Sequence, residues 1–341
     1  MKVSIGAKII DGPWGGGNLF VINLSSHLIE KGHEVVYDLI DDDIDLILLT
    51  DPRKSSESST FTHKNIKRYK KKNSKVKVVH RINECDERKN TRLMNLRLRL
   101  SNYAADHTIF VGTWLTKLNV WRFQDKKPFS IILNGSDPEI FKKFNSVSWN
   151  KKKPIKIVTH HWSGNWFKGF DIYRHLDNLL DKEEWKDLIK FTYIGNLPKG
   201  FSFKNVNYVP PQETIALANL LKENHIYLTA SINEPGGNHQ NEGGMCGLPL
   251  LYRDSGCMKE YCEGFGISFN GLDDFNLSLK KLINEYDYWK LKMNYFDRNI
   301  HKCIKSYVDL IEDLNQKRDK IVKNRSLLRN PFVFFINQII N

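Results

Sequence analysis

The chain has 341 residues, 40% of them hydrophobic and 12% aromatic, which is enough for two domains with cores of their own and argues against a disordered protein. Its five cysteines form no C-x-x-C pair, so they predict reduced thiols in a cytosolic protein and argue against a disulfide framework or a structural zinc site. The formal net charge of +13 predicts attraction to anions, but no nucleic-acid-binding motif accompanies the basic residues, and nucleic acid is discounted as a partner.

The first half of the chain reads as alternating strands and helices. Residues 2–7 alternate in the manner of a strand, residues 12–17 are rich in glycine, and residues 18–31 predict a helix that ends at Gly32. Apolar runs predict further strands at residues 33–39, 44–49, 76–79, 108–111 and 131–133. Strands that alternate with helical stretches favour a mostly parallel sheet.

Three consecutive glycines, Gly15, Gly16 and Gly17, lie between the first strand and the first helix. Backbone N–H groups and the positive end of the helix can approach an anion there, so this loop is a candidate phosphate site. Its spacing is neither G-x-G-x-x-G nor that of a Walker A loop, and a structural turn is the alternative interpretation.

Basic residues are concentrated at 64–77 and again at 151–153. Such patches attract phosphate-bearing substrates or acidic lipid headgroups, and a solvated helix face is an equal alternative.

The second half repeats the architecture without repeating the sequence. A polar, lysine-rich connection at 142–154 is the expected linker, and residues 169–180 and 213–223 predict helices. Strands are expected at residues 155–159, 191–194, 206–209, 226–230, 249–252 and 266–269. The fold class is therefore α/β, with two Rossmann-like domains facing across a cleft: residues 1–145, joined by about 318–341, and residues 150–317.

Residues from 273 onward are expected to be mainly helical, and the apolar stretch 331–340 needs a surface to pack on. We expect the C-terminal helix to cross back to the first domain, with an interfacial membrane anchor as the alternative. No apolar run reaches the roughly 20 residues of a spanning helix, and the start of the chain lacks the apolar core of a signal peptide.

The stretch from 230 to 249 carries the strongest functional signal. Glu234 and Glu242 are separated by seven residues in a loop that follows a strand and leads into a helix, so both can face a ligand at the carboxyl ends of the strands. Carboxylates accept hydrogen bonds from sugar hydroxyls, and Gly236 and Gly237 leave backbone amides open to a sugar or phosphate.

Together with these residues, the chain resembles the GT-B glycosyltransferases, specifically the retaining family 4. Its E-x7-E motif matches Glu234 to Glu242 and its G-L-P matches residues 247–249. Further similarity lies in the GGG loop, in N-G-S-D at 134–137, in K-G-F-D at 168–171 and in A-D-H at 105–107.

The resemblance implies that Glu242 binds the nucleotide ribose, that Glu234 lies beside the donor sugar and that Lys168 neutralises the diphosphate. The family usually has an arginine where this chain has Ser163; either Arg253 or His161 compensates for it, or donor binding is weaker. The candidate donor-binding residues are Gly15, Gly16, Gly17, Ser163, Lys168, Glu234, Gly236, Gly237, Asn238 and Glu242.

The candidate catalytic residues are Glu234, Lys168 and His80, which follows a strand of the first domain and suits acid or base chemistry near neutral pH. Acceptor or sugar contact is expected from Arg81, Asn83, Glu84 and His161, and a structural role is the alternative for each. His160, next to His161 after the first strand of the second domain, is a further candidate for phosphate or sugar contact.

The predicted activity is transfer of a sugar from a nucleoside-diphosphate sugar, UDP- or GDP-linked, to a hydroxyl of a surface polysaccharide, lipopolysaccharide or lipid-linked glycan. By analogy the anomeric configuration is retained, by a front-face route. No cofactor is expected. The acidic run 41–45 invites comparison with the metal-binding D-x-D of the GT-A fold, but it precedes its strand, so a solvated turn and metal-independent activity are expected.

Two other functions are open. The first is a sugar-nucleotide epimerase or hydrolase on the same scaffold, because a fold does not fix chemistry. The second is a catalytically degenerate binder of nucleotide sugars or glycans, which the serine at position 163 supports. The expected location is the cytoplasm, with peripheral association at the inner face of a membrane as an extension.

Overall fold

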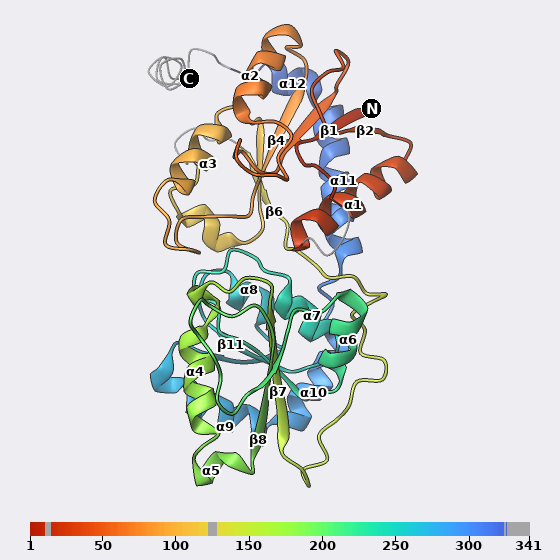
Figure 1. Cartoon of the computed structure of the whole chain (residues 1–341). Coiled ribbons are helices and arrows are strands. Elements are labelled where there is room, and N and C mark those ends of the chain that lie inside the picture. The colour runs from red at the N-terminus through yellow and green to blue at the C-terminus, as the bar shows by residue number, and fades with distance from the viewer. Residues whose placement is uncertain (11–14, 122–127, 324, 326–341) are drawn as a thin grey trace. The chain divides into compact units, whose positions relative to one another are not determined.

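The computed structural model describes residues 1–10, 15–121, 128–323 and 325 (Figure 1). The chain divides into two compact units: unit 1 comprises residues 1–86, 90–132 and 303 onward, and unit 2 comprises 87–89 and 133–302. The lysine-rich segment 142–154 lies within unit 2. The apolar stretch 331–340 lies outside the described residues.

Unit 1 is built on a six-stranded parallel sheet in the order β2-β1-β3-β4-β5-β6. Val3 pairs with Leu46, and Ile47 pairs with Val78. The central strands are buried on both faces, which explains why they appear in the sequence as continuous apolar runs. The strands are β1 (Lys2–Ile5), β2 (Glu34–Val36), β3 (Leu46–Leu49), β4 (Lys77–Ile82), β5 (His107–Phe110) and β6 (Phe129–Ile131).

Helices pack against this sheet and one of them comes from the far end of the chain. The expected face of α1, with Phe20, Leu24 and Leu28, is buried. Tyr307 of α11 packs its ring against Phe20 with centroids 4.8 Å apart, so the expected return of the C-terminal helix to the first domain is confirmed (Figure 1). The helices are α1 (Gly15–Glu30), α2 (His63–Lys72), α3 (Met94–Asn102), η1 (Thr113–Lys117), α11 (Ile300–Gln316) and α12 (Arg318–Lys323).

The acidic run that precedes β3 is a turn held by Lys2. The Lys2 ammonium lies 2.9 Å from the Asp41 carboxylate and 2.8 Å from that of Asp43. Two of the acidic side chains are therefore ion-paired to the first strand of the sheet.

Unit 2 also contains a six-stranded parallel sheet, in the order β12-β11-β10-β7-β8-β9. The chain runs outward from β7 to β9, then returns to the other side of β7, where Ile226 of β10 pairs with Ile157. The strand order therefore reverses between β7 and β10, and ligands of open α/β sheets bind at such a point. The strands are β7 (Ile155–His161), β8 (Ile189–Gly195), β9 (Asn207–Val209), β10 (Ile226–Thr229), β11 (Leu250–Arg253) and β12 (Gly266–Phe269).

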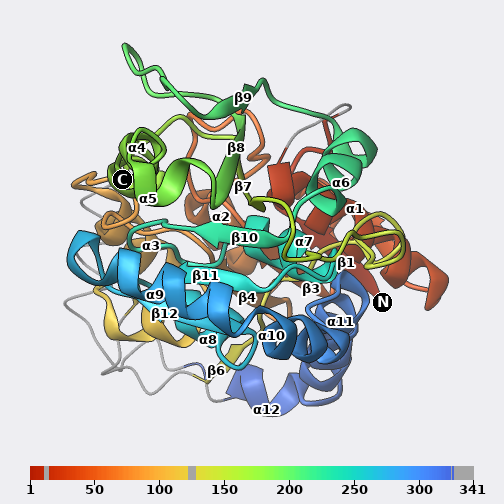
Figure 2. The ribbon, with the colours of Figure 1, turned by 90° about the horizontal axis from the view of Figure 1, so that it is seen from below.

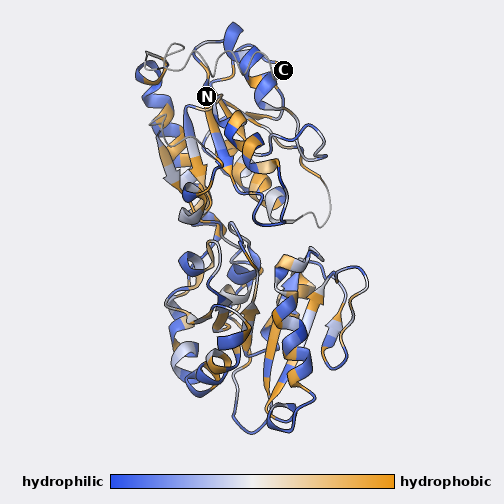
Figure 3. Cartoon of the chain, turned by 90° about the vertical axis from the view of Figure 1, so that its left-hand side faces the viewer, coloured by the Kyte–Doolittle hydropathy of each residue, from blue (hydrophilic) through white to orange (hydrophobic). Residues whose placement is uncertain are grey.

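Helices cover both faces of the unit 2 sheet: α4 and α5 lie on one side of β7 and β8, and α6 and α7 lie on the other (Figure 2). Hydrophobic residues are concentrated on the strands and the adjoining helix faces of each unit (Figure 3), so each unit has a core of its own. The helices are η3 (Trp166–Lys168), α4 (Phe170–Leu179), α5 (Glu183–Lys186), α6 (Thr214–Lys222), α7 (His239–Met245), α8 (Met258–Cys262), α9 (Leu272–Asn284), α10 (Tyr286–Lys292) and η4 (Met293–Tyr295). Within the described residues, none of the helices has the length and apolar character needed to span a bilayer.

Candidate functional site

Two pairs of side chains meet where β7 and β10 end in unit 2. The Lys168 ammonium Nζ lies 2.5 Å from Oε2 of Glu234. The His160 ring nitrogen Nε2 lies 2.6 Å from Oε2 of Glu242. Each carboxylate of the E-x7-E motif is thus partnered by a residue from the end of β7 or the loop after it.

Local backbone geometry places Lys168 at this point. The Asn165 side chain accepts a hydrogen bond from the backbone N–H of Phe167 and caps the short helix that contains the lysine. Gly169 follows with φ of +100°, and a Cβ at this position would lie 2.4 Å from the Cβ of Ala230. The glycine of K-G-F-D therefore lets the loop after β7 pack directly against the end of β10.

Glu234 is a buried, ionised carboxylate with 1% of its surface exposed. Burial alone would raise the pKa of its side chain, but the charges of Lys168 and Arg88 lower that pKa to about 2. Arg88, which belongs to unit 2, has its Nε 3.6 Å from Oε1 of Glu234. The charge of Glu234 is therefore balanced without solvent.

Helix α7 holds Glu242 in its first turn, where the carboxylate faces His160. A Cβ at Gly243 would lie 2.3 Å from the Tyr227 ring, so the glycine allows α7 to approach β10 closely. The Glu242 side chain keeps 17% of its surface exposed. It is therefore fixed on one side and open to solvent on the other.

Asn134 ties the N-G-S-D segment to the loop of the E-x7-E motif. Its side-chain amide donates to the carbonyl of Gly236 at 2.6 Å, and its own carbonyl accepts from the Asn241 amide at 3.1 Å. Its backbone N–H donates to the Tyr261 hydroxyl at 2.8 Å. The sequence indicated the N-G-S-D motif but not this contact, which holds the loop that carries Gly236 and Gly237.

Two further histidines lie beside His160 and are sealed in the core. The ring nitrogen Nε2 of His161 is 2.6 Å from the Tyr173 hydroxyl, and that of His239 is 2.8 Å from the Thr229 hydroxyl. Burial holds the pKa of both imidazoles well below the usual value, so both are neutral. His161, expected at the sugar, is 3% exposed and its side chain contacts the interior of unit 2 instead.

Arg253 does not replace the arginine that the family usually has where this chain has Ser163. Its guanidinium donates to both oxygens of Asp171, at 2.6 and 3.1 Å, and also to two backbone carbonyls. Ser163 is partly exposed and its hydroxyl accepts from the Asn165 backbone N–H at 3.3 Å. Lys168 therefore stands as the cation of this loop next to the carboxylates.

The candidates on unit 1 follow or lie within β4. His80 is fully buried, with Nδ1 3.2 Å from the Asn102 side-chain oxygen. The Arg81 guanidinium lies 4.2 Å from the centroid of the Phe20 ring and donates to the Tyr307 hydroxyl, which ties β4 to α1 and α11. Asn83 and Glu84 follow the strand, and their side chains are partly exposed. Their acceptor contacts, like the catalytic role of His80, stay predictions.

The three glycines Gly15, Gly16 and Gly17 form the first turn of α1. A Cβ at Gly17 would meet no atom of the described residues within 4 Å, so open space adjoins this position there. The position suits an anion, and binding there stays a prediction.

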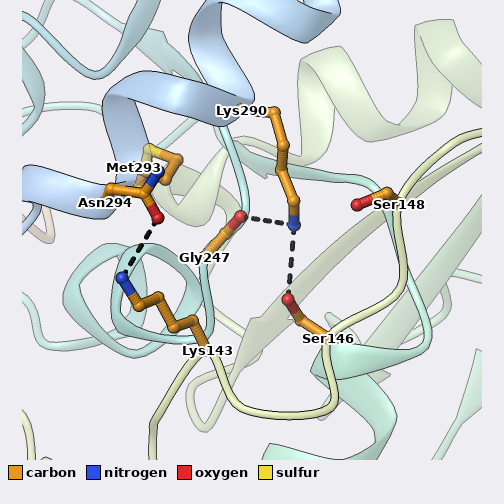
Figure 4. A pocket seen from close by; sticks show the side chains of 7 residues that line it. All are labelled: Lys143, Ser146, Ser148, Gly247, Lys290, Met293 and Asn294. Atoms are coloured by element: carbon orange, nitrogen blue, oxygen red, sulfur yellow. Dashed lines mark hydrogen bonds between the residues drawn. The ribbon is translucent and has the colours of Figure 1, made fainter.

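A separate pocket of about 200 Å³ lies at the other end of α7 (Figure 4). Lys290 donates to the carbonyl of Gly247 at 2.9 Å and to the Ser146 hydroxyl at 3.3 Å, and burial lowers the pKa of its ammonium. Its charge thus satisfies the C-terminal end of the helix that carries Glu242. The lining residues are Lys143, Ser146, Ser148, Gly247, Lys290, Met293 and Asn294.

No known family profile and no curated protein matches the sequence. Solved structures do match. The catalytic domain of starch synthase IV from Arabidopsis thaliana, bound to ADP and acarbose, superposes with a TM-score of 0.66 at 13% identity, over 95% of this chain and 99% of that one. Sucrose-phosphate synthase from Thermosynechococcus elongatus gives 0.63 at 13% identity, over 92% and 98%.

HepE from Anabaena, in complex with UDP and glucose, gives a TM-score of 0.61 at 12% identity, over 92% of this chain and 99% of that one. Likeness at such identities shows the fold. The expected GT-B architecture, with two parallel sheets and a C-terminal helix that returns to the first unit, is confirmed.

Proposed function

We propose that the chain is a glycosyltransferase that moves a sugar from a nucleoside-diphosphate sugar to an acceptor hydroxyl. The observation that carries this proposal is the placement of Glu234 and Glu242, each with a partner from the end of β7 or the loop after it, where the strand order of a GT-B unit reverses. The solved structures with bound ADP or UDP support a nucleotide as the ligand class.

In this proposal each charged group has a distinct part. Glu242, with one oxygen turned to His160 and an exposed flank, accepts hydrogen bonds from the ribose hydroxyls. Lys168 neutralises the diphosphate, and Glu234 holds that lysine in place and lies beside the transferred sugar. The remaining donor contacts come from the backbone and short side chains of Ser163, Gly236, Gly237 and Asn238.

The proposed chemistry is a metal-independent front-face transfer with retention. The bond between the anomeric carbon and the diphosphate oxygen breaks while the acceptor oxygen bonds to the same face of that carbon. The acceptor proton passes to the departing phosphate oxygen, whose charge Lys168 offsets. The first-formed product, observed by NMR, distinguishes retention from inversion.

The donor is proposed to carry UDP or GDP, and the acceptor to be a surface polysaccharide, lipopolysaccharide or lipid-linked glycan. Support for an anionic acceptor comes from helix α2, which buries Ile66 and Tyr69 and exposes basic side chains. Those exposed in and just after the helix are Lys64, Arg68, Lys71, Lys72 and Lys75.

The test is a thermal-shift and calorimetry panel of UDP, GDP and ADP and their sugar conjugates. A ligand at about 100 times its Kd stabilises the folded state by about 2.7 kcal/mol. We expect one nucleotide series to bind wild type and to lose binding in Glu242→Ala. The matched control is Glu213→Ala, which removes an exposed glutamate of the same unit.

Product analysis with the binding donor then separates the activities. Transfer to added glycan acceptors supports the proposal, whereas turnover without acceptor indicates an epimerase or hydrolase. Binding without any product indicates a degenerate binder. Absence of binding by every nucleotide tested contradicts the proposal.

A further inference from the structure

A chain of hydrogen bonds leads from the core of unit 2 to Glu242. We propose that His160, held by Tyr227, is a positioning residue that fixes the Glu242 carboxylate for the ribose hydroxyls of the donor. This inference rests on the proposed function, in which Glu242 binds that ribose.

Tyr227 contacts the ring nitrogen of His160 that does not face Glu242. The tyrosine is fully buried on β10, and burial raises the pKa of its hydroxyl well above the usual value, so the hydroxyl keeps its proton. Its oxygen accepts the backbone N–H of His160 at 3.4 Å and lies 3.1 Å from the ring nitrogen Nδ1. The hydroxyl therefore contacts both the backbone and the ring of His160 and holds the ring in place.

A carboxylate oxygen can only accept a hydrogen bond, so the Nε2 nitrogen that faces Glu242 carries a proton. That N–H donates to Oε2 of Glu242 at 2.6 Å. Among the residues that the structure describes, His160 is the one side chain that hydrogen-bonds this carboxylate, and Oε1 is left to the exposed flank. Loss of His160 would leave the glutamate free to rotate before a ligand arrives.

The basic side chains around His160 are hydrogen-bonded to partners other than Glu242. His239 lies with its ring centroid 6.4 Å away, and His161 packs edge-to-face against His239 with centroids 4.7 Å apart. Both neighbours are neutral and are bonded to Thr229 and Tyr173. Lys168, from the loop after β7, is bound to Glu234. Neither histidine therefore competes with His160 for Glu242.

The test compares nucleotides with and without ribose hydroxyls. Calorimetry measures the Kd of UDP, GDP and ADP and of their 2′,3′-dideoxy analogues for wild type and variants. His160→Leu is expected to weaken the binding ribonucleotide about tenfold, the equivalent of one hydrogen bond, and to leave the dideoxy analogue unchanged. A merely structural role of His160 would weaken both ligands equally, and that result overturns the inference.

Conservative variants still test the inference if His160→Leu folds poorly. His160→Gln retains an N–H donor near the Nε2 position and is expected to bind the ribonucleotide within about threefold of wild type. Tyr227→Phe removes the group that orients the ring, and an intermediate loss confined to the ribonucleotide is expected. The matched control is His175→Leu. The His175 imidazole hydrogen-bonds Asn276 and so links α4 to α9, outside the proposed site.

Glu242→Ala separates this inference from the proposed function. If Glu242→Ala loses ribonucleotide binding and His160→Leu does not, the positioning role is wrong and the proposed function stands. If Glu242→Ala also binds normally, the ribose site itself is wrong and the inference falls with it.

Discussion

Lys168 and Glu234 form an ion pair of 2.5 Å in which the side chains are 11% and 2% exposed. The two residues follow β7 and β10, which are neighbours in the sheet although 66 positions separate the pair in the chain. The lysine that we propose to meet the diphosphate is thus already held and desolvated. The pair therefore links the stability of unit 2 to the proposed donor site.

Replacement of Lys168 by methionine is expected to lower the free energy of unfolding by about 3 kcal/mol, because Glu234 would lose its principal counter-charge in a buried place. Urea unfolding measures the loss, and Lys186→Met, from an exposed pair with Glu183, is expected to cost under about 1 kcal/mol. The double variant Lys168→Met with Glu234→Gln should regain much of the stability while activity stays lost. Equal stability of all four proteins would show that the ion pair does not contribute to the free energy of unfolding.

Acid should destabilise the fold through its buried histidines. Burial holds the pKa of His161 and His239 well below the usual value near 6.5, so below pH 6.5 the unfolded chain binds protons that the folded chain does not. Each such histidine then removes about 1.4 kcal/mol per pH unit as the pH falls from 6.5 towards the folded-state pKa. Urea titrations between pH 5 and 8 measure the slope, and His239→Gln should reduce it by about one proton. An unchanged slope in that variant would mean that His239 is protonated in the folded protein.

Two glycines with positive φ allow the stability cost of backbone strain to be measured separately from the cost of a steric clash. Gly169 has φ of +100° and a Cβ there would lie 2.4 Å from Ala230. Gly200 has φ of +74°, and a Cβ there would have no neighbour within 4 Å among the residues that the structure describes. Gly200→Ala is expected to cost about 1 kcal/mol from strain alone. Gly169→Ala should cost about 2 kcal/mol more, because the clash adds to the strain, and should weaken donor binding by shifting Lys168. Equal unfolding midpoints for the two variants would contradict the packing argument.

The exposed face of α2 should bind anionic bilayers if the acceptor is membrane-bound. Each basic residue near such a surface contributes about 1 kcal/mol, so changing Lys64, Lys71 and Lys72 together to glutamine should weaken binding to phosphatidylserine vesicles by at least tenfold. Co-sedimentation over a salt series measures the effect. The charge-matched control changes the exposed Lys151, Lys152 and Lys153 of unit 2. Equal losses in both variants would indicate general attraction by net charge rather than a surface on α2.

The sequence by itself determined the local elements and the motif residues. Apolar periodicity predicted both parallel sheets, because a strand buried on both faces needs a continuous apolar run wherever it stands in the fold. The spacing of the carboxylates indicated Glu234 and Glu242, and the resemblance to the GT-B glycosyltransferases added Lys168 to the same predicted site. These features depend on neighbours in the chain, so they can be recognised without coordinates.

Only the tertiary structure decided which of these side chains meet. The order of the strands brings β7 beside β10, and periodicity contains no information on which strands are neighbours. His160 and His161 show the consequence: consecutive residues of a strand point to opposite faces of the sheet, so two histidines that looked equivalent had to separate. One bonds Glu242 and the other bonds Tyr173. Which of the two would face the carboxylate depended on the register of β7 in the sheet, and that register is fixed by contacts between segments far apart in the chain.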